Sequence, residues 1–361
     1  MTLETLGWSP FFETQFQPFF DRGLLPARVV AESRELYRLL HPEGECWGEI
    51  TGALRYRAEA RTDLPVVGDW VAAQPFPGGP AVIHAVLPRR TLLARRAAGR
   101  RTEAQPVGAN VDTVLVLTSL NQDLNLRRLE RYLALVGGSG AQPVIVLSKA
   151  DLAGDAGAAL QAVAAVAGNA PVRAVSAFSG EGLEELEPYL GPGRTVALLG
   201  SSGVGKSTLV NRLLGAERQA VKEIREGDDR GRHTTTAREL IPLPAGALLL
   251  DTPGMRELGL AGDGEGLDEV FADIAELAAH CRFGDCRHQD EPGCAVAQAL
   301  RDGRLDPARK AGFDKLRNEE TWMANRLEGG AAFAEKKRWK AVHQRLKQQG
   351  FKDGARTKPR Q

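Results

Sequence analysis

The sequence predicts a multidomain chain: a small all-β barrel or sandwich, a doubly wound α/β domain, and a small helical region built around a cysteine cluster. Between residues 26 and 97, short alternating segments are separated by Pro and Gly, which favours an all-β module. From Val111 onward, apolar runs alternate with helical patterns, as expected for parallel strands and crossover helices. Three of the four cysteines then fall between Cys281 and Cys294. At 361 residues the chain is long enough for all three parts.

Composition places the chain among ordinary globular proteins, with 43% hydrophobic and 26% charged residues. The start, from Met1 to Trp8, has no basic segment followed by an apolar core, and no later apolar run approaches the roughly 20 residues that span a bilayer. We therefore expect a cytoplasmic protein without membrane contact. In that reducing compartment, clustered cysteines point to metal binding sooner than to disulfides.

Changes in composition divide the chain into five segments. These are an N-terminal extension at 1–25, the barrel at 26–97, the α/β domain at 98–265, a helical domain with the cysteines at 266–334 and a basic tail at 335–361. Apolar runs predict strands at Val111 to Leu117, Pro143 to Leu147, Val172 to Val175, Thr195 to Leu199 and Ala247 to Leu250. Periodic segments predict helices at Asn125 to Val136, Ala156 to Ala167, Leu183 to Leu190 and Lys206 to Leu214.

A phosphate-binding loop follows the strand that ends at Leu199. The segment fits G-x-x-x-x-G-K-[ST] and lies between a strand and a helix, which is the context that this motif requires. Its glycines let backbone N–H groups surround phosphate oxygens. Lys206 would neutralise β and γ oxygens, and Ser207 would bind Mg²⁺. The residues expected to bind the phosphates of the nucleotide are Gly200, Ser201, Ser202, Gly203, Val204, Gly205, Lys206, Ser207 and Thr208.

Two further segments are expected around the γ-phosphate. Asp251, in Asp-Thr-Pro-Gly after an apolar strand, would hold a water bound to Mg²⁺, and the N–H of Gly254 would contact the γ-phosphate. The polar loop 226–236 resembles one that becomes ordered around Mg²⁺, with Thr234 or Thr235 as a ligand. An ordinary surface loop remains the alternative for this segment.

The base is predicted to be guanine. Ser148-Lys149-Ala150-Asp151 resembles the Asn-Lys-x-Asp box, in which the Asp151 carboxylate would accept hydrogen bonds from guanine that adenine cannot donate. Lys149 would lie along the purine face. Ser176 and Ala177 begin a second guanine motif, in which the Ala177 N–H would meet O6. Ser148 stands where the box usually has Asn, and so lacks an amide that ties the base site to the phosphate loop.

The order of these motifs is reversed. In the usual order the phosphate loop comes first and the guanine box last, whereas here both guanine motifs precede Gly200. A circular permutation of the domain produces this order without altering the sheet. It also makes the segment after Asp251 lead directly into the C-terminal domain, so nucleotide state could reposition that domain.

The cysteine cluster has the spacing of a metal site. Cys281, Cys286, His288 and Cys294 supply three thiolates and one imidazole, a full tetrahedral Zn²⁺ set with no open position. A closed site is structural, so we expect one zinc per chain without a catalytic role. Buried free thiols are the alternative.

Two basic clusters suggest contacts with nucleic acid. The tail 335–361 carries ten Lys or Arg against two acidic residues. A solvated tail is the alternative to an RNA contact. The candidates for RNA contact are Arg89, Arg90, Arg95, Arg96, Arg100, Arg101, Lys336, Lys337 and Arg338.

Together these residues resemble the RsgA family, the circularly permuted ribosome small-subunit-dependent GTPases of bacteria. The resemblance extends from the barrel through the segment 231–236 to the cysteine cluster and the following Ala295-Val296. It implies an OB-fold barrel, a GTPase domain and a small α-helical zinc-binding domain. It also implies binding to the 30S subunit and its 16S rRNA late in maturation, hydrolysis of GTP to GDP stimulated by the subunit, and release afterwards. We expect a monomer that uses Mg²⁺ with GTP.

The sequence offers no obvious residue to orient the attacking water. Met255 stands where many GTPases have Gln after Asp-x-x-Gly, so we expect slow turnover of the free enzyme, with His233 as the candidate for this role on the subunit. Two alternatives remain. An ATP-driven enzyme conflicts with Asp151, and an rRNA-binding scaffold that switches with nucleotide but turns over little leaves Lys206 without a purpose.

Overall fold

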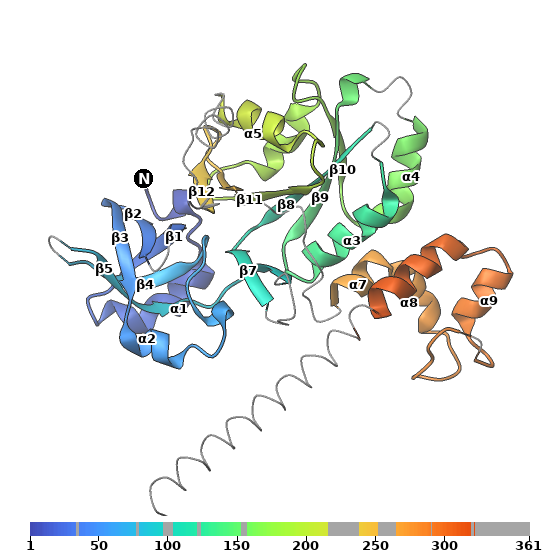
Figure 1. The fold of residues 1–361 in the computed structure, drawn as a ribbon, viewed down its shortest axis with the longest axis horizontal. Coiled ribbons are helices and arrows are strands. Elements are labelled where there is room, and N and C mark those ends of the chain that lie inside the picture. The colour runs from blue at the N-terminus through green and yellow to red at the C-terminus, as the bar shows by residue number, and fades with distance from the viewer. Residues whose placement is uncertain are drawn as a thin grey trace, which may run out of the picture.

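A computed structural model of the chain describes residues 1–33, 36–76, 79–96, 104–120, 124–152, 157–215, 238–251, 265–289, 291–318 and 321. Within these ranges the chain forms a barrel, an α/β domain and a group of C-terminal helices, with the α/β domain between the other two (Figure 1). None of the helices in these ranges combines the length and apolar character needed to cross a bilayer.

The barrel consists of five strands, each paired with two others of the set. They follow the order β1-β2-β3-β5-β4, and β4 pairs again with β1. Four pairings are antiparallel, and β3–β5 is parallel. The strands are β1 (Leu25–Ser33), β2 (Leu36–His41), β3 (Gly44–Ile50), β4 (Trp70–Gln74) and β5 (Ala81–Val86), with α2 (Gly52–Arg57) and η2 (Arg61–Asp63) between β3 and β4. This is the five-stranded OB-fold topology, so the expected barrel is confirmed.

The aromatic residues at the start of the chain pack on the barrel. η1 (Glu4–Leu6) is followed by α1 (Pro10–Phe20), which begins with a proline in its first turn, where the missing N–H costs no helical hydrogen bond. Phe12 and Phe16 are buried in one cluster with Trp70 of β4. Trp8 meets Trp70 edge-on, with ring centroids 4.7 Å apart. The first 25 residues therefore cover one end of the barrel core.

The α/β domain is a sheet of six strands in the order β10-β9-β8-β11-β13-β12, parallel except for β12. The strands are β8 (Thr113–Ser119), β9 (Gln142–Ser148), β10 (Val172–Val175), β11 (Thr195–Gly200), β12 (Glu239–Pro242) and β13 (Leu248–Asp251). The helices are α3 (Leu126–Gly137), η3 (Ala150–Leu152), α4 (Gly157–Ala167), η4 (Leu183–Tyr189) and α5 (Lys206–Leu214). All five predicted strands are present within two residues.

One predicted helix was wrong in type. The segment Leu183–Tyr189, predicted as an α-helix, is a 3₁₀ helix that contains Pro188. Proline lacks an N–H and its ring clashes with the carbonyl four residues earlier, so an α-helix through this position is disfavoured. The strand β12 was not predicted, and neither was the hairpin of β6 (Leu92–Arg96) and β7 (Ala104–Ala109). The predicted boundary at residue 97 falls between the strands of this hairpin.

The barrel and the α/β domain share a sheet edge. Ala31 of β1 pairs with Glu239 of β12, so strands from both domains are continuous in one hydrogen-bonded order. Arg38 of β2 forms an ion pair with Glu239 beside this contact. Because β12 is adjacent to β13, the barrel is joined to the side of the sheet that carries Asp251.

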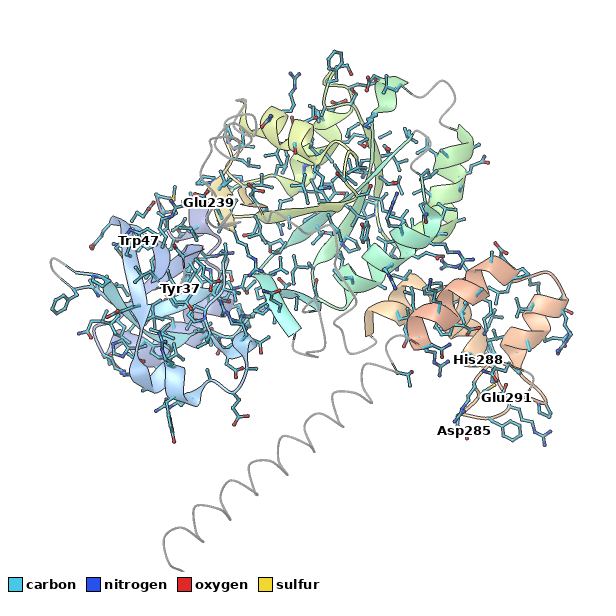
Figure 2. All side chains as sticks on the ribbon, viewed as in Figure 1. Tyr37, Trp47, Glu239, Asp285, His288 and Glu291 are labelled. Atoms are coloured by element: carbon cyan, nitrogen blue, oxygen red, sulfur yellow. The ribbon has the colours of Figure 1, made fainter. Side chains whose placement is uncertain are left out.

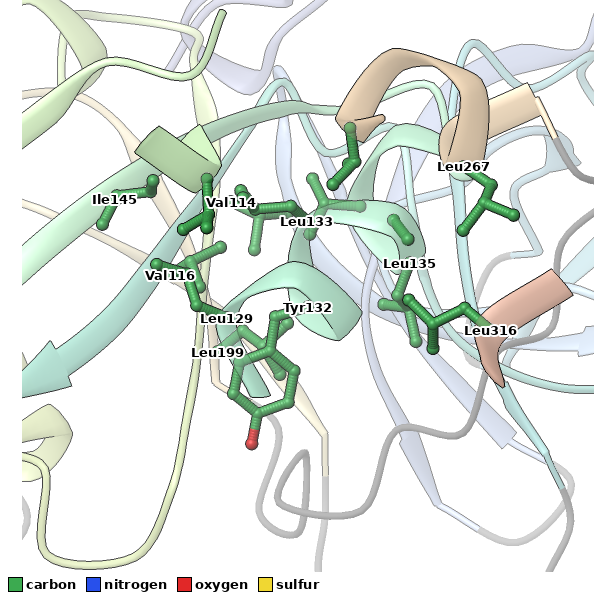
Figure 3. Packing of buried hydrophobic residues seen from close by; sticks show 14 of the residues in the cluster. Val114, Val116, Leu129, Tyr132, Leu133, Leu135, Ile145, Leu199, Leu267 and Leu316 are labelled. Carbon is green, nitrogen blue, oxygen red and sulfur yellow. The ribbon is translucent and has the colours of Figure 1, made fainter. Parts of the chain in front are cut away.

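The C-terminal helices pack on α3. They are α7 (Glu265–Val270), α8 (Ala272–Ala278), α9 (Ala295–Arg301) and a helical segment at 307–318. One cluster of buried residues runs from the sheet through α3 into these helices. Figure 3 shows its members Leu133 and Val114 on the sheet side, and Leu135 with Leu267 and Leu316 on the other. The α/β domain and the C-terminal helices therefore have a common hydrophobic core.

Candidate nucleotide and metal sites

The phosphate loop lies at the end of β11, a central strand between β8 and β13. Gly203 and Gly205 have φ values of 75° and 99°, which residues with a Cβ rarely adopt, so the loop requires glycine at both positions. α5 begins at Lys206 immediately after this turn. The Lys206 ammonium folds over the loop and donates to the carbonyl oxygens of Gly200, at 2.6 Å, and of Ser201. The strand and the helix predicted on either side of the loop are confirmed.

The guanine box is tied to the phosphate loop by two hydrogen bonds. Ser148, the last residue of β9, donates from Oγ to the carbonyl of Val204 at 2.6 Å. Lys149 has a left-handed backbone with φ 61°, and its Nζ donates to the carbonyl of Gly203 at 2.8 Å. The amide of the usual Asn is absent, as the sequence shows, but the Ser148 hydroxyl also reaches the phosphate loop. Asp151 follows in η3 and is exposed.

The second guanine motif is a turn held by its own hydrogen bonds. Ser176 is fully buried, its N–H donates to the carbonyl of Glu181 at 2.9 Å, and its carbonyl accepts from Gly180 at 2.9 Å. Its Oγ accepts from the N–H of Ser179 at 3.1 Å. Val175 pairs in register with Ser148, so this turn and the guanine box leave the sheet at the same edge. Ala177 is partly buried, and the exposed residues Phe178 and Ser179 follow it.

Asp251 ends β13, which is parallel to β11 and next to it. The carboxyl ends of the two strands therefore place Asp251 at the same edge of the sheet as the phosphate loop. Ser207, in the first turn of α5, is exposed at that edge. Oxygen ligands of this kind fit Mg²⁺. The predicted residues Gly254, His233, Thr234 and Thr235 lie outside the described residues, as does Met255.

The cysteine cluster is brought together as expected. The ligand atoms of Cys281, Cys286, His288 and Cys294 all lie within 4.8 Å of one another. The Sγ atoms of Cys281 and Cys294 are 3.9 Å apart, and His288 Nδ1 is 3.5 Å and 3.7 Å from them. A tetrahedral ion with bonds of ~2.3 Å to sulfur separates its ligands by about 3.8 Å. The donor set and its spacing therefore fit Zn²⁺ bound through Nδ1 of His288.

The predicted RNA contacts divide according to what their side chains already bind. Arg89 donates to both carboxylate oxygens of the buried Asp69, at 2.8 and 2.7 Å, and to the carbonyls of Thr62 and Leu64, so it has little left to offer a phosphate. Arg90 is half exposed, at 47% of its side chain, with one contact of 3.3 Å to Asp112. Arg95 and Arg96 belong to β6, but their side chains lie outside the described residues. The whole of Arg100, Arg101, Lys336, Lys337 and Arg338 lies outside them as well.

Several residues that matter for the arrangement had no signal in the sequence. Arg28 and Arg309 are buried or nearly so at the two joints of the α/β domain, and Glu291 holds the loop around His288. A single Arg or Glu in a sequence is usually a surface residue. Their positions follow only from contacts between distant segments.

A parallel sheet with a phosphate loop on a central strand, tied to a guanine box on β9, defines a P-loop GTPase. The guanine motifs come first in sequence, so the domain is circularly permuted.

The sequence model of the RsgA GTPase family matches residues 86–261. The small ribosomal subunit biogenesis GTPase RsgA of Opitutus terrae is 51% identical over 354 residues, which cover 95% of this chain and 96% of that protein. The protein of the same name from Syntrophotalea carbinolica is 43% identical over 350 residues, 95% of this chain and 96% of that one. The chain belongs to the RsgA family of GTPases.

Solved structures agree with this assignment. The crystal structure of YjeQ from Thermotoga maritima is 26% identical to this chain with a TM-score of 0.60, and the match covers 82% of this chain and 99% of that one. The structure of YloQ, described as a circularly permuted GTPase, is 24% identical with the same TM-score of 0.60 and covers 82% of this chain and 95% of that one. This second likeness shows the shared fold.

Proposed function

We propose that this GTPase acts in biogenesis of the small ribosomal subunit, binds the 30S particle and its 16S rRNA late in maturation, and leaves after hydrolysing GTP. The observation that carries the nucleotide part is the pair of hydrogen bonds from Ser148 and Lys149 to the phosphate loop. They fix the distance between the base site and the phosphate site, so one nucleotide can occupy both. The ribosomal part rests on the names of the relatives, which are small ribosomal subunit biogenesis GTPases.

Within the site, the chain's own groups bind and orient the nucleotide. The N–H groups of the loop 200–208 surround the phosphates, and the Lys206 ammonium turns from its loop carbonyls to β and γ oxygens. Asp151 accepts from guanine, and the Ala177 N–H donates to O6. Ser207, with Thr234 or Thr235, binds Mg²⁺ directly, and Asp251 acts through a water. Mg²⁺ supplies neutralisation of the charge that spreads over the phosphates.

Turnover of the free protein is slow, because Met255 cannot orient a water. Gly254 contacts the γ-phosphate through its N–H, and His233 orients the attacking water when the subunit holds the preceding loop. Replacement of His233 by Ala then removes most of the stimulation by 30S subunits while binding to the subunit persists. Full stimulated turnover by that variant excludes this role.

The barrel supplies an RNA surface. In OB-folds the face of strands 2 and 3 binds oligonucleotides. Here Trp47 of β3 is 46% exposed, which places an aromatic ring on that face. A base stacks on such a ring with little dependence on sequence. The half-exposed Arg90, with Arg95, Arg96, Arg100, Arg101 and the basic tail, adds contacts to phosphates.

The C-terminal helices bind one structural Zn²⁺ through Cys281, Cys286, His288 and Cys294. The ligand atoms are already within the spacing of a tetrahedral ion, and no fifth protein ligand is offered among the described residues. The protein acts as a monomer in the cytoplasm.

One experiment tests the proposal: hydrolysis of GTP and of ATP by the purified chain, with and without 30S subunits. We expect GTP turnover that rises strongly with 30S subunits and ATP turnover at background. Replacement of Asp151 by Asn adds a sharper test, since the amide can donate to the O2 of xanthine. That variant should lose GTP and gain XTP as substrate, whereas an unchanged GTP preference would exclude the proposed guanine box.

The alternative of an rRNA-binding scaffold predicts a different outcome. A scaffold binds 30S subunits in a nucleotide-dependent way but shows no stimulated hydrolysis. The variant Lys206→Ala separates the GTPase from the scaffold. Loss of turnover should slow release from 30S subunits only if hydrolysis is part of the function. Release from 30S subunits that is equally fast with Lys206→Ala would support the scaffold.

A further inference from the structure

The loop between Cys286 and Cys294 contains a residue in an unusual conformation. His288 has a φ of 60°, in the left-handed region, although it is not a glycine. Its ring is buried, and Nδ1 faces the sulfur atoms of Cys281 and Cys294 at 3.5 and 3.7 Å. A non-glycine residue keeps such a backbone only where neighbouring contacts hold it.

Glu291 provides those contacts. Its Oε1 accepts from the N–H of Arg287 at 3.0 Å, and its Oε2 accepts from the N–H of Gln289 at 2.8 Å. These two N–H groups belong to the residues immediately before and after His288. The carbonyl of Glu291 also accepts from the N–H of Cys294 at 3.1 Å. One residue thereby fixes the backbone at two of the four ligands, and Figure 2 shows Glu291 and His288 in the same loop with Asp285.

We propose that Glu291 is the positioning residue of the metal centre: its carboxylate bridges the N–H groups of Arg287 and Gln289 and so holds the His288 imidazole in the orientation that binds the ion. The inference rests on the metal site proposed above. Glu291 is not itself a ligand, since its oxygens bind amides and the group of four ligand atoms does not include it. Residues that orient ligands in this way typically change metal affinity by about 10–100-fold when removed.

A negative charge near a cation also favours binding, so charge and positioning must be separated. Asp285 gives the control, because it is an exposed carboxylate of the same loop and next to Cys286. Asp285→Asn removes one charge and leaves the bridge intact. Glu291→Gln removes the same charge but keeps one acceptor oxygen, and Glu291→Ala removes both acceptors.

The experiment measures Zn²⁺ affinity of the full chain by competition with a chromogenic chelator, and the absorption of the Co²⁺-loaded protein as a report on ligand geometry. We expect Glu291→Ala to weaken Zn²⁺ binding by about 10–100-fold and to alter the Co²⁺ spectrum. Glu291→Gln should fall between Glu291→Ala and the unchanged protein, and Asp285→Asn should bind as the unchanged protein does. If Glu291→Ala does not fold, Glu291→Gln against Asp285→Asn carries the test.

The outcomes against the proposal are distinct. Equal losses in Asp285→Asn, Glu291→Gln and Glu291→Ala, with an unchanged Co²⁺ spectrum, would show an effect of charge alone and overturn the positioning role. Unchanged affinity in Glu291→Ala would overturn it as well. Failure of the unchanged protein to bind Zn²⁺ or Co²⁺ would instead overturn the metal site itself.

Discussion

Two buried arginines lie at the two joints of the GTPase domain, and their charges are satisfied in different ways. Arg28 of β1 lies between the barrel and the GTPase domain, and Arg309 of the segment 307–318 lies between the GTPase domain and the C-terminal helices. Arg28 donates to neutral oxygens, whereas Arg309 donates to two carboxylates. The two joints therefore respond differently to the loss of their arginine.

Arg28 donates hydrogen bonds to acceptors in three separate segments of the chain. Its guanidinium donates to the carbonyl of Leu6 at 2.6 Å, the carbonyl of Asn110 at 3.3 Å and Oγ1 of Thr195 at 3.1 Å, and it lies over the ring of Trp70. Burial lowers the pKa of Arg28 to about 10, against the attraction of Asp112 and Asp69, so the group remains charged at neutral pH. A charge buried among neutral acceptors specifies the geometry of the joint more than it stabilises it.

Arg309 is held by ions. It forms a bidentate pair with Asp273 of α8, both contacts at 3.0 Å, and donates to Glu130 of α3 at 2.9 Å. It also donates to the carbonyl of Val270 at 2.6 Å and lies over the ring of Phe271. Burial alone would lower the pKa of Arg309, but its hydrogen bonds and the charges of Asp273 and Glu130 raise it.

The two arginines have different roles because the other contacts at the two joints differ. At the barrel joint, β1 and β12 share backbone hydrogen bonding, so Arg28 adds orientation to a connection that exists already. At the other joint, among the described residues, helices pack on α3 without a shared sheet. Within the described ranges this joint is held by side-chain contacts. If nucleotide state repositions the C-terminal domain, the Arg309 contacts and the shared core must break.

The largest effect is expected from Arg309→Met. The substitution leaves the Glu130 side chain, only 4% exposed, without the donor that holds its Oε1. Removal of one partner from a buried ion pair costs about 3–5 kcal/mol, so we expect the free energy of unfolding to fall by about 3 kcal/mol. Urea denaturation of the full chain measures this.

Arg304→Met is the matched control for this substitution. Arg304 lies in the same region and pairs with Asp302, but the two side chains are 59% and 41% exposed. Exposed pairs contribute about 0–1 kcal/mol. Equal losses in the two variants would contradict the interpretation of Arg309 as the main ionic contact of the joint.

A smaller effect is expected from Arg28→Leu. Three acceptors lose their donor, each at about 1–3 kcal/mol, but the substitution also removes a buried charge instead of creating one. The two contributions partly cancel, and we expect a net loss of about 2 kcal/mol in the free energy of unfolding. Arg22→Leu, at an exposed arginine of the same domain, should change stability by less than ~0.5 kcal/mol. If Arg28→Leu lowered the free energy of unfolding more than Arg309→Met does, the barrel joint would depend more on its arginine than the C-terminal joint.

The sequence predicted the local parts of this molecule and missed the joints. The strand before the phosphate loop, the loop itself and the helix at Lys206–Leu214 were predicted because strand, turn and helix are contiguous there. The cysteine cluster was equally visible, since its ligands lie within 14 residues. By contrast, Arg28 and Thr195 are 167 positions apart, and Arg309 and Glu130 are 179 apart. Such contacts leave no periodic or spacing signal.

At two further positions the structure differs from the sequence prediction for local reasons. β12 is a strand of four residues that ends in Pro242, too short for an alternating pattern to be recognised. The hydrogen bond from Ser148 to Val204 depends on how closely β9 approaches the phosphate loop, which the motif alone does not reveal. The sequence shows which residue replaces the usual Asn, but only the structure shows that its hydroxyl reaches the same loop.

A third prediction concerns the ion pair beside the shared sheet edge. The side chains of Arg38 and Glu239 are 26% and 25% exposed, and the backbone pairing at Glu239 does not depend on them. A double-mutant cycle with Arg38→Met and Glu239→Gln should therefore give a coupling of about 0.5–1 kcal/mol, reduced in about 1 M salt, where screening acts over about 3 Å. A coupling above that of the Arg309 contacts would show that ions, not the sheet, hold the barrel joint.

The smallest effect is expected from Glu130→Gln, and its pH dependence sharpens the comparison most. Burial raises the pKa of the Glu130 carboxyl above its ordinary value of 4.5, although the hydrogen bond and charge of Arg309 lower it. The pKa shifts of the two partners therefore give different indications of how strongly the pair stabilises the fold. The raised pKa of Arg309 shows that its charged form is stabilised, mainly by Asp273. The raised pKa of Glu130 shows that its ionised form is not. A raised carboxyl pKa means that the stability Glu130 contributes is present below pH 4.5 and is lost as pH rises through the folded pKa.

At pH 7 the neutral amide introduced by Glu130→Gln can still accept from Arg309, so we expect this variant to change the free energy of unfolding by less than ~1 kcal/mol. The variant should gain stability relative to the unchanged protein as pH rises from about 4.5 to 7, as measured by urea denaturation across that range. The opposite slope, with the unchanged protein gaining as pH rises, would mean that ionised Glu130 stabilises the joint. In that case the ion pair on α3, and not the bidentate pair with Asp273, would be the contact that holds the C-terminal helices.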